Sequence, residues 1–373
     1  MTRRLEQRRT RTSDYAPVLA GHGRRLPVLL LLTALPTVAA CGSDTAAPTT
    51  GFEWPVVAPA EAGLDTARLR SMVAHIGADL PNLNALLIVR GGAVSFEWYT
   101  PRVAPGTAFD TRSVTKSFVA AFVGIALHRG WLTSLDQKVT EFYPDLLTDP
   151  DADPRIRDLT LRHLMTMSSG IEDEQTQRYT LDTADLVGKF LRLPLLFDPG
   201  TSWLYDGANP HIVSGVITKV SGSSLSELAY ADLFPRLNIA EAYWINDTDG
   251  VSNGGTGLWL APRDLAKLGE LYLRDGVWQG ERLMPPDFAR QSAGTVSYAL
   301  PNGFADYAQF WWTSDRYGPR LWIAAGFRQQ YVVVVPDFDM VIVIQSQSYD
   351  PPAPIVDHFH LVTQYILPAV TPG

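Results

Sequence analysis

The chain has 373 residues and a formal net charge of −8. Its hydrophobic fraction of 46% and charged fraction of 19% are ordinary for a globular enzyme and exclude a disordered or fibrous protein. Residues 1 to 40 carry seven arginines against Glu6 and Asp14, a charge of +5, so the remainder carries −8 − 5 = −13. Such an acidic body argues against a nucleic-acid-binding protein.

The first forty residues have the features of an export signal. Arg24 and Arg25 precede an apolar run from Leu26 to Ala40, which is too short and too interrupted by proline to span a membrane. The region before this run is long for a signal peptide. A twin-arginine signal and a start codon assigned too early therefore both stay open as explanations.

Cys41 is the only cysteine of the chain and follows the apolar run directly. The stretch from Val38 to Cys41 resembles the lipobox of bacterial lipoproteins, which implies lipidation of Cys41. We therefore expect an exported lipoprotein on the outer face of a bacterial cell membrane. Residues 41–53 would supply the lipidated cysteine and a flexible tether, and residues 54–373 the folded domain. With no second cysteine, no intrachain disulfide can form.

The folded part is predicted to begin with a helix and a hairpin. Apolar residues at helical spacing predict a helix from Thr66 to Leu80. Two strand-like runs around Gly91 and Gly92 predict a β-hairpin over residues 86–99. A second helix follows, and its residues 118–127 are apolar on every face, which predicts a helix buried in a core.

The spacing of Ser113 and Lys116, at the start of that second helix, is the strongest indication of chemistry. A serine hydroxyl needs a neighbouring group to take its proton during acyl transfer, and positions i and i+3 of a helix are neighbours. Burial lowers the pKa of a lysine, which suits its amine to the role of base. Of the five lysines, only Lys116 has a serine three residues before it. The alternative, a capping serine followed by a solvated lysine, fits poorly with the apolar run.

The middle of the chain predicts an all-helical lobe, and the last third predicts strands. Helical patterns interrupted by Pro, Asp and Gly extend over residues 131–246, with one short helix from Leu161 to Gly170. A further helix is predicted from Pro262 to Arg274. Strands and a closing helix follow at residues 321–326, 331–335, 340–344 and 358–367. Strands from both ends would form one mainly antiparallel sheet, an α+β fold with the site between sheet and lobe.

Five motifs, in order, resemble the serine β-lactamase and penicillin-binding protein superfamily. The similarity is to its class C-like branch of esterases, D-aminopeptidases and 6-aminohexanoate-dimer hydrolases. The motifs are Phe109 to Phe118, Leu161 to Ile171, Pro199 to Tyr205, Gly254 to Gly269, and Gly326. The resemblance implies a β-lactamase/transpeptidase-like fold, in which the antiparallel sheet is flanked by helices from both chain ends. It also implies an acyl-enzyme mechanism with Ser113 as nucleophile, Lys116 as its proton partner and no cofactor.

The resemblance implies roles for two residues of the third motif region. Tyr205 matches the tyrosine of the family's Y-x-N motif, which shares the base role and protonates the leaving group. A core aromatic residue with a satisfied hydroxyl is the alternative interpretation. The third position of the motif is Gly207 instead of Asn, and Asn209 is the expected substitute in substrate binding.

The family's strand motif, K-T-G in β-lactamases, is here two alanines followed by Gly326. Gly326 keeps the close backbone approach to substrate, so the N–H of Phe327 is expected to pair with that of Ser113 as an oxyanion hole. Ala324 offers no charge for the carboxylate of a β-lactam or peptide. Arg328 is the expected replacement in substrate binding, although a surface arginine is the commoner role. These departures favour an ester or amide hydrolase over antibiotic resistance.

The sequence therefore predicts an exported serine hydrolase that cleaves a small ester or amide through an acyl-serine intermediate. A penicillin-binding D,D-carboxypeptidase or β-lactamase is the second hypothesis, and a non-catalytic surface binding protein is the third. Glycine-rich residues 252–257 lack a P-loop lysine and predict a turn. His358 and His360 lack further ligands nearby, so no metal site is predicted.

Overall fold

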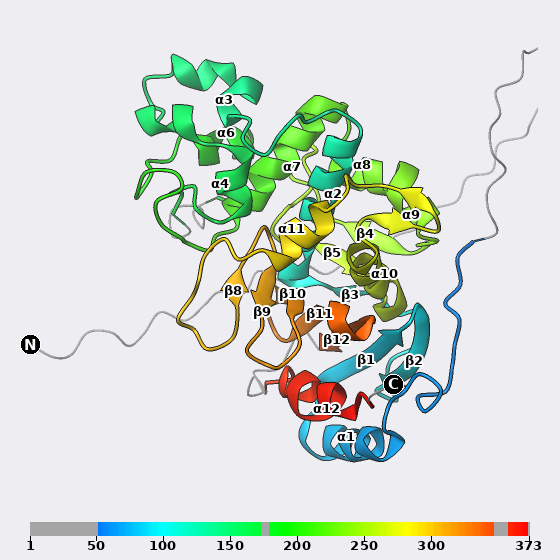
Figure 1. Cartoon of the computed structure of the whole chain (residues 1–373). Helices are drawn as coiled ribbons and strands as arrows, with labels where there is room; N and C mark the ends of the chain where they lie inside the picture. The colour runs from blue at the N-terminus through cyan, green and yellow to red at the C-terminus, as the bar shows by residue number, and fades with distance from the viewer. Residues whose placement is uncertain (1–50, 173–178, 347–356, 372–373) are drawn as a thin grey trace, which may run out of the picture. The chain divides into compact units, whose positions relative to one another are not determined.

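The computed structural model describes residues 51–172, 179–346 and 357–371 (Figure 1). The expected export signal, Cys41 and nearly all of the tether lie outside these residues, so their assignments stay predictions. Within the described part, no helix is long and apolar enough to cross a membrane.

A seven-stranded antiparallel sheet forms the centre of the fold. Its order is β2 (Ala93–Tyr99), β1 (Leu83–Arg90), β12 (Met340–Ser346), β11 (Gln330–Val335), β10 (Leu321–Gly326), β9 (Trp312–Ser314) and β8 (Asp306–Tyr307). Both chain ends contribute strands, because β1 pairs with β12. The predicted hairpin is confirmed, and its turn residues Gly91 and Gly92 have φ of 60° and 73°, as a tight hairpin turn requires. The predicted α+β fold is confirmed.

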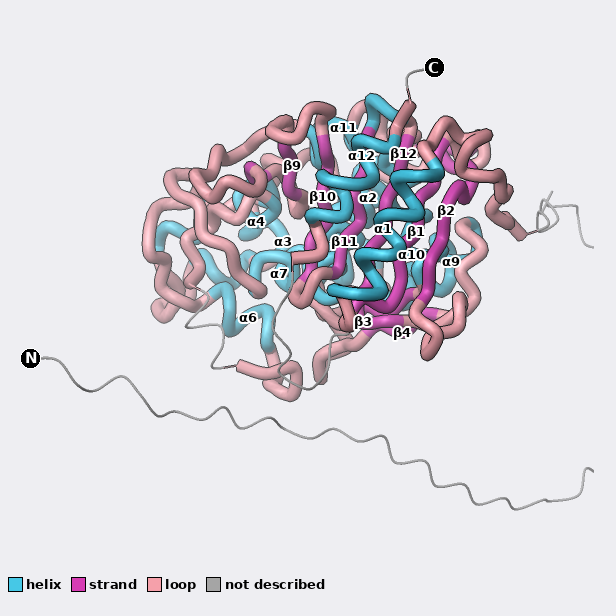
Figure 2. Tube along the Cα trace, turned by 90° about the horizontal axis from the view of Figure 1, so that it is seen from below, coloured by secondary structure: helices cyan, strands magenta, loops and turns pink. Residues whose placement is uncertain are grey.

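Alternate residues of the central strands point into two hydrophobic cores, as the period of two requires. Leu86 and Ile88 belong to one core, and Leu87 and Val89 to the other. Figure 2 shows α1 and α12 over the first face of the sheet. The second core contains the apolar residues of α2 and α10, which cover the opposite face. Helices from both chain ends therefore flank the sheet, as expected.

Three predicted helices are present with small shifts. They are α1 (Thr66–Asp79), α2 (Thr115–His128) and α10 (Pro262–Leu273). The closing helix differs more, because it consists of π-helical residues Leu361–Ile366 followed by the short α12 (Leu367–Ala369). The predicted helix at residues 161–170 ends earlier, since α4 covers Leu161–Met165 and Met167 has a left-handed φ of 57°.

Helices supply nearly all the regular structure described between residues 131 and 246, and several of them contact α7 (Figure 1). Its helices are α3 (Val139–Phe142), the 3₁₀ turns Pro144–Leu147 and Pro154–Asp158, α4, α6 (Leu186–Leu191), α7 (Ala208–Ser221), α8 (Leu225–Leu228), the π-helical Ala229–Leu233 and α9 (Phe234–Arg236). The region ends in a strand, β4 (Ala242–Trp244), which the prediction of an all-helical lobe missed.

Short elements complete the fold. Strand β4 pairs with β5 (Leu258–Leu260), which also pairs with β3 (Phe109–Asp110), and this small sheet connects the helical region to the start of α2. The remaining elements are β6 (Val277–Trp278), β7 (Glu281–Arg282), α11 (Phe288–Gly294) and the 3₁₀ turns Arg112–Val114 and Pro336–Phe338. The turn at Arg112–Val114 holds the predicted nucleophile.

Candidate active site

Ser113 lies in a 3₁₀ turn just before α2, where the sequence suggested an α-helix. Arg112 enters this turn with a left-handed φ of 51°, a conformation that costs energy for a residue with a Cβ atom. Asp110 stabilises it, because one carboxylate oxygen accepts the backbone N–H of Arg112 at 2.9 Å and the other pairs with its guanidinium at 3.2 Å. The predicted nucleophile thus lies on a tight, side-chain-stabilised turn.

Lys116 lies beside Ser113 and is buried, with 4% of its surface exposed. Its Nζ lies 3.0 Å from the Ser113 hydroxyl oxygen and donates a second hydrogen bond of 2.8 Å to the backbone carbonyl of Gly255. As a neutral amine, the same nitrogen is within reach of the hydroxyl proton. The structure therefore brings together the pair that the sequence predicted.

Gly255 is a partner that sequence reasoning did not identify. Its glycine-rich segment was predicted to turn and belongs to the fourth family motif, but no role was assigned to Gly255, because a backbone carbonyl leaves no side-chain signal in a sequence. The N–H of Gly255 is in turn bound by the side chain of Asn253 at 2.9 Å. Gly255 also packs on the start of α7, where a Cβ atom on it would lie 3.2 Å from the carbonyl oxygen of Gly207. The carbonyl that holds Lys116 is therefore fixed by its neighbours.

Tyr205 faces the same lysine. The Nζ of Lys116 lies 5.0 Å from the centroid of the Tyr205 ring, within range of a cation–π contact. Trp312 stacks on Tyr205, with ring centroids 5.9 Å apart and an interplanar angle of 28°. Burial, and then the charges of Tyr205 and Asp206, raise the pKa of the adjacent Tyr307 well above its usual value. Tyr307 therefore remains a neutral packing partner.

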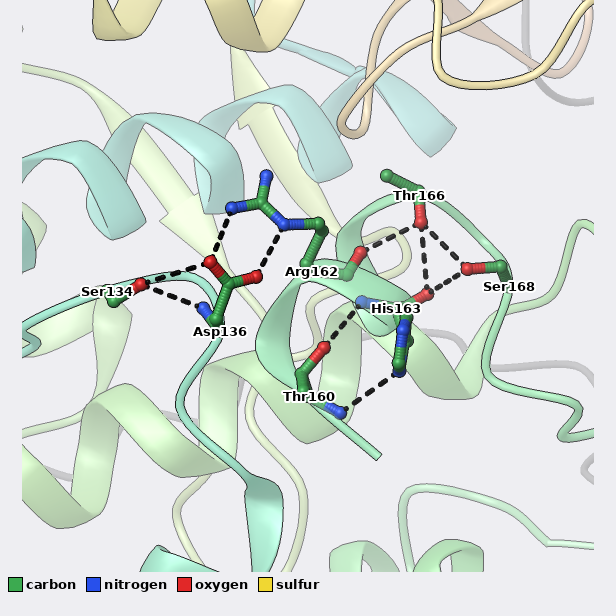
Figure 3. Close-up of polar contacts among 7 residues, drawn as sticks. All are labelled: Ser134, Asp136, Thr160, Arg162, His163, Thr166 and Ser168. Atoms are coloured by element: carbon green, nitrogen blue, oxygen red, sulfur yellow. Dashed lines mark hydrogen bonds and ion pairs between the residues drawn. The ribbon is translucent and has the colours of Figure 1, made fainter. Parts of the chain in front are cut away.

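The loop that carries Tyr205 rests on α4, whose ends are fixed by polar contacts (Figure 3). Thr160 caps the helix by accepting the N–H of His163 at 3.3 Å. Arg162 binds both carboxylate oxygens of Asp136, at 2.6 Å and 3.0 Å. These hydrogen bonds from Arg162 hold the pKa of the Asp136 carboxyl below its usual value. The helix is anchored at its first turn and on its outer side.

Beyond α4, the backbone pairs with the loop that leads to Tyr205. The N–H of Leu204 binds the carbonyl of Met167 at 2.9 Å, and that of Gly200 binds the carbonyl of Ser168 at 2.8 Å. Gly200 has a φ of 86°, and a Cβ atom there would lie 2.9 Å from the Nε2 of His163. Two of the motifs on which the family resemblance rests are therefore neighbours in space, and one supports the other.

Ser113, Lys116 and Tyr205 line one cavity of about 450 Å³. A cavity of this size suits a small-molecule ligand. Its apolar lining residues include Leu181, Leu186 and Phe190. A second cavity of about 550 Å³, around Arg290, Arg320 and Trp322, contains none of the three residues.

Gly326 brings the last residue of β10 against the nucleophile turn. A Cβ atom on Gly326 would lie 2.5 Å from the carbonyl oxygen of Thr111 and 3.1 Å from the Cβ of Arg112. Phe327 follows with 61% of its surface exposed, and its backbone N–H is next to the strand end that contacts the turn. This arrangement agrees with the expected oxyanion hole, whose assignment stays a prediction.

None of the three predicted substrate-binding residues, Asn209, Gly326 and Arg328, lines the cavity of Ser113. Asn209 is fully buried in the first turn of α7, where its side-chain amide and backbone N–H both bind the carboxylate of Asp206. Arg328 is half-buried with a left-handed φ of 59°, and its guanidinium carbon lies 5.7 Å from the ring of Phe327. Asp206 and Gly207, next to Tyr205 in sequence, line the cavity instead.

His211 is a cavity residue that the sequence did not suggest. It lies on α7, is 2% exposed, and its Nε2 is 3.0 Å from the Asp247 carboxylate. Asp247 lies 36 residues further along the chain, so no local spacing indicates the pair. Within the described ranges, no cluster of three or more His, Cys, Asp or Glu side chains could hold a metal ion.

The chain is similar to several known proteins. The family model described as Beta-lactamase matches residues 69–365. A 6-aminohexanoate-dimer hydrolase of Paenarthrobacter ureafaciens is 26% identical over 290 residues, which cover 72% of this chain and 73% of that protein. A lovastatin esterase of Penicillium rubens is 29% identical over 133 residues, which cover 30% of this chain and 33% of that protein.

Solved structures show the same fold. The octameric penicillin-binding protein homologue from Pyrococcus abyssi has a TM-score of 0.63 at 20% identity, covering 80% of this chain and 77% of that chain. EstCE1, a hydrolase with promiscuous acyltransferase activity, has a TM-score of 0.61 at 15% identity, covering 76% of this chain and 93% of that chain. Because the family model spans most of the folded part, from α1 to the closing helix, the chain belongs to the β-lactamase family.

Proposed function

We propose that this protein is a serine hydrolase that cleaves a small ester or amide through an acyl-Ser113 intermediate. One observation carries the proposal: the buried Lys116 amine lies 3.0 Å from the Ser113 hydroxyl, and both residues line one cavity. No carboxylate of the described residues forms an ion pair with Lys116, and burial of an isolated charge is costly, so a purely structural role would not explain its position. Relatives named as a 6-aminohexanoate-dimer hydrolase and a lovastatin esterase support the same class of reaction.

In the proposed acylation, neutral Lys116 takes the proton of Ser113 while the serine oxygen attacks the carbonyl carbon of the substrate. The negative charge on the carbonyl oxygen is stabilised by the N–H groups of Ser113 and Phe327. The C–O or C–N bond to the leaving group then breaks, and the leaving group takes a proton from Tyr205 or from protonated Lys116. Water, deprotonated by the same groups, cleaves the acyl-serine ester and restores the serine hydroxyl.

The surroundings of the serine favour a simple ester or amide over a β-lactam. Ala324, at the position of the charged residue in the family's strand motif, is buried with 1% exposure and offers no cation. Arg328, the expected substitute, stacks near Phe327 outside the cavity lining. Leu181, Leu186 and Phe190 supply apolar surface. A substrate carboxylate would therefore find few partners in this cavity.

The proposal includes export and attachment to the outer face of a bacterial membrane through lipidated Cys41. It is supported by the apolar run that ends at Ala40 and by the single cysteine that follows it. Incorporation of a labelled fatty acid in cells tests this part independently. Labelling of the native chain but not of a Cys41→Ala variant is expected, and equal labelling of both chains would contradict it.

The hydrolase proposal is tested with a chromogenic short-chain ester and with intact-mass measurement after a fluorophosphonate. We expect ester turnover and addition of one phosphonyl group, both lost in Ser113→Ala. Ser117→Ala is the matched control, because Ser117 is a buried serine in the first turn of α2 whose hydroxyl donates to the carbonyl of Phe310. Turnover or labelling that survives in Ser113→Ala would overturn the proposal.

The same preparation distinguishes the second enzyme hypothesis. Stable labelling of Ser113 by a fluorescent penicillin, without turnover of any ester, would favour a penicillin-binding carboxypeptidase. Rapid hydrolysis of a chromogenic cephalosporin would favour a β-lactamase. Absence of all Ser113-dependent turnover over a broad set of esters and amides would favour the binding-protein hypothesis.

A further inference from the structure

The buried pair of His211 and Asp247 has no part in the mechanism above, yet it lies at the edge of the same cavity. The two side chains are 2% and 1% exposed, and the Nε2 of His211 is 3.0 Å from an oxygen of Asp247. Desolvation opposes ionisation of Asp247, but the hydrogen bonds from His211 and from the backbone outweigh it and lower the pKa of the carboxyl. Since Asp247 is ionised, Nε2 of His211 carries the proton and donates it.

Asp247 uses its other carboxylate oxygen to shape a loop. That oxygen accepts the N–H of Val251 at 2.8 Å and the N–H of Asp249 at 3.0 Å. The backbone N–H of Asp247 also binds the carbonyl of Val251, at 2.8 Å. The carboxylate therefore closes the turn over residues 247–251, while His211 attaches that turn to α7.

The loop continues directly to the carbonyl that holds Lys116. Ser214, on α7, donates to the carbonyl of Ser252 at 2.7 Å. Asn253 binds the N–H of Gly255 through its side chain at 2.9 Å. Gly254 lies against α7, where a Cβ atom on it would come within 2.8 Å of the backbone nitrogen of His211. Successive contacts thus connect Asp247 to Gly255 along one face of α7.

We infer that His211, through Asp247, positions the Gly255 carbonyl that holds Lys116 against Ser113. Both are positioning residues, since neither is among the partners of the serine or the lysine. The inference rests on the proposed function, because it concerns the lysine that activates Ser113. Without the His211 contact, the turn at Asp247 loses its attachment to α7, and the lysine amine loses a fixed acceptor on the side away from the serine.

The test is the second-order rate constant for phosphonylation of Ser113 by a small fluorophosphonate, followed by intact mass. This probe requires the activated serine and little of the cavity that His211 lines. His211→Phe keeps an aromatic ring but removes the donor to Asp247. We expect its rate constant to fall roughly 10- to 100-fold, the loss typical of a small displacement of a reacting group.

Two matched variants separate positioning from general destabilisation. His211→Gln places an amide N–H where Nε2 donates to Asp247, and it should recover most of the rate lost in His211→Phe. Ile217→Ala leaves a cavity elsewhere on α7, where Ile217 is fully buried, and it should lower the thermal midpoint without a comparable loss of rate. If Ile217→Ala slows phosphonylation as much as His211→Phe does, or if His211→Gln recovers nothing, the inference is wrong.

A double-mutant cycle identifies Lys116 as the residue through which His211 acts. In a Lys116→Ala background, His211→Phe should cause little further loss in the residual rate, since the lysine it positions is absent. Independent losses that multiply would overturn the inference. Failure of the proposed function is distinguishable, because the native chain and Ser113→Ala would then be labelled equally.

Discussion

Gly326 packs so closely on Thr111 that a Cβ atom added to the glycine would lie 2.5 Å from the threonine carbonyl oxygen. Real side chains do not approach a backbone oxygen this closely, so any other residue must push β10 away from the nucleophile turn. The turn carries Ser113, and β10 leads into the N–H of Phe327. The distance between the N–H groups of Ser113 and Phe327, which form the predicted oxyanion hole, therefore depends on the absence of a Cβ atom at Gly326.

Gly326→Ala is accordingly expected to lower ester turnover by roughly 100-fold, because a small displacement of reacting groups has effects of that order. It should also cost about 1–3 kcal/mol of stability from overpacking. Steady-state kinetics and urea unfolding measure the two effects. Gly77→Ala, in α1 with no neighbour within 4 Å of the new Cβ atom, is the control and should leave turnover unchanged. Native turnover in Gly326→Ala would contradict the argument.

The second prediction concerns Asp110, which binds the backbone and the side chain of Arg112. Asp110→Ala removes the acceptor that stabilises the left-handed conformation before Ser113. We expect a loss of about 1.5–3 kcal/mol, the range for a hydrogen bond to a charged group, and a lower rate of serine phosphonylation.

Asp110→Asn gives the control for this prediction. Its side-chain oxygen can still accept the backbone N–H of Arg112, while the charge that pairs with the guanidinium is gone. Its stability and phosphonylation rate should therefore lie between those of the native chain and Asp110→Ala. Equal behaviour of Asp110→Ala and the native chain would show that the turn does not need the carboxylate.

The contacts of the candidate site show what a single sequence can and cannot predict. Ser113 and Lys116 were predictable because three residues along a helical turn fix their relation locally. Gly326 was expected to permit a close approach, but its partner Thr111 is more than two hundred residues away in sequence. No role was predicted for Gly255 or for the pair of His211 and Asp247, because their contribution comes from a backbone carbonyl and from tertiary contacts.

The differences between the predicted and the observed fold have similar causes. The hairpin and the long strands β10, β11 and β12 were predicted correctly, since alternation and turn residues act over short distances. The short strands β8 and β9 of the same sheet were not predicted. The strand β4 is three residues long and is stabilised by pairing with β5. It is therefore too short for its own residues to show the alternation that predicts a strand. Asn209 was assigned to substrate from its place after Tyr205, whereas the structure uses it to bind Asp206.

The third prediction concerns Trp312, which stacks on Tyr205 at 5.9 Å between centroids. Trp312→Ala should lower kcat for the ester by about tenfold, because Tyr205 loses the surface that orients it for proton transfer. Trp312→Phe keeps an aromatic face and should retain most of the activity. Trp278, which packs on Phe52 and Trp54 away from the cavity, supplies the control variant Trp278→Phe. A change in KM alone would indicate a role in binding instead.

The last prediction concerns the pH dependence of stability. His358 is 2% exposed, and its Nδ1 lies 2.6 Å from the hydroxyl of Ser346. Burial, assisted by the charge of His360, lowers the pKa of His358 to about 4. Between pH 4 and the unfolded value near 6.5, the unfolded chain binds a proton at this position and the folded chain does not.

The sign follows from linkage: stability rises with pH where the unfolded state binds more protons, so His358 destabilises the fold as the pH falls from about 6.5 towards 4. The slope from this residue alone is about 1.4 kcal/mol per pH unit. His358→Asn keeps a polar partner for Ser346 but does not titrate, so its stability should fall less between pH 7 and pH 4.5. Urea unfolding of both chains across this range measures the difference. Parallel curves would mean that His358 takes up its proton equally in both states, and the neutral, buried imidazole would then be the wrong description of this residue.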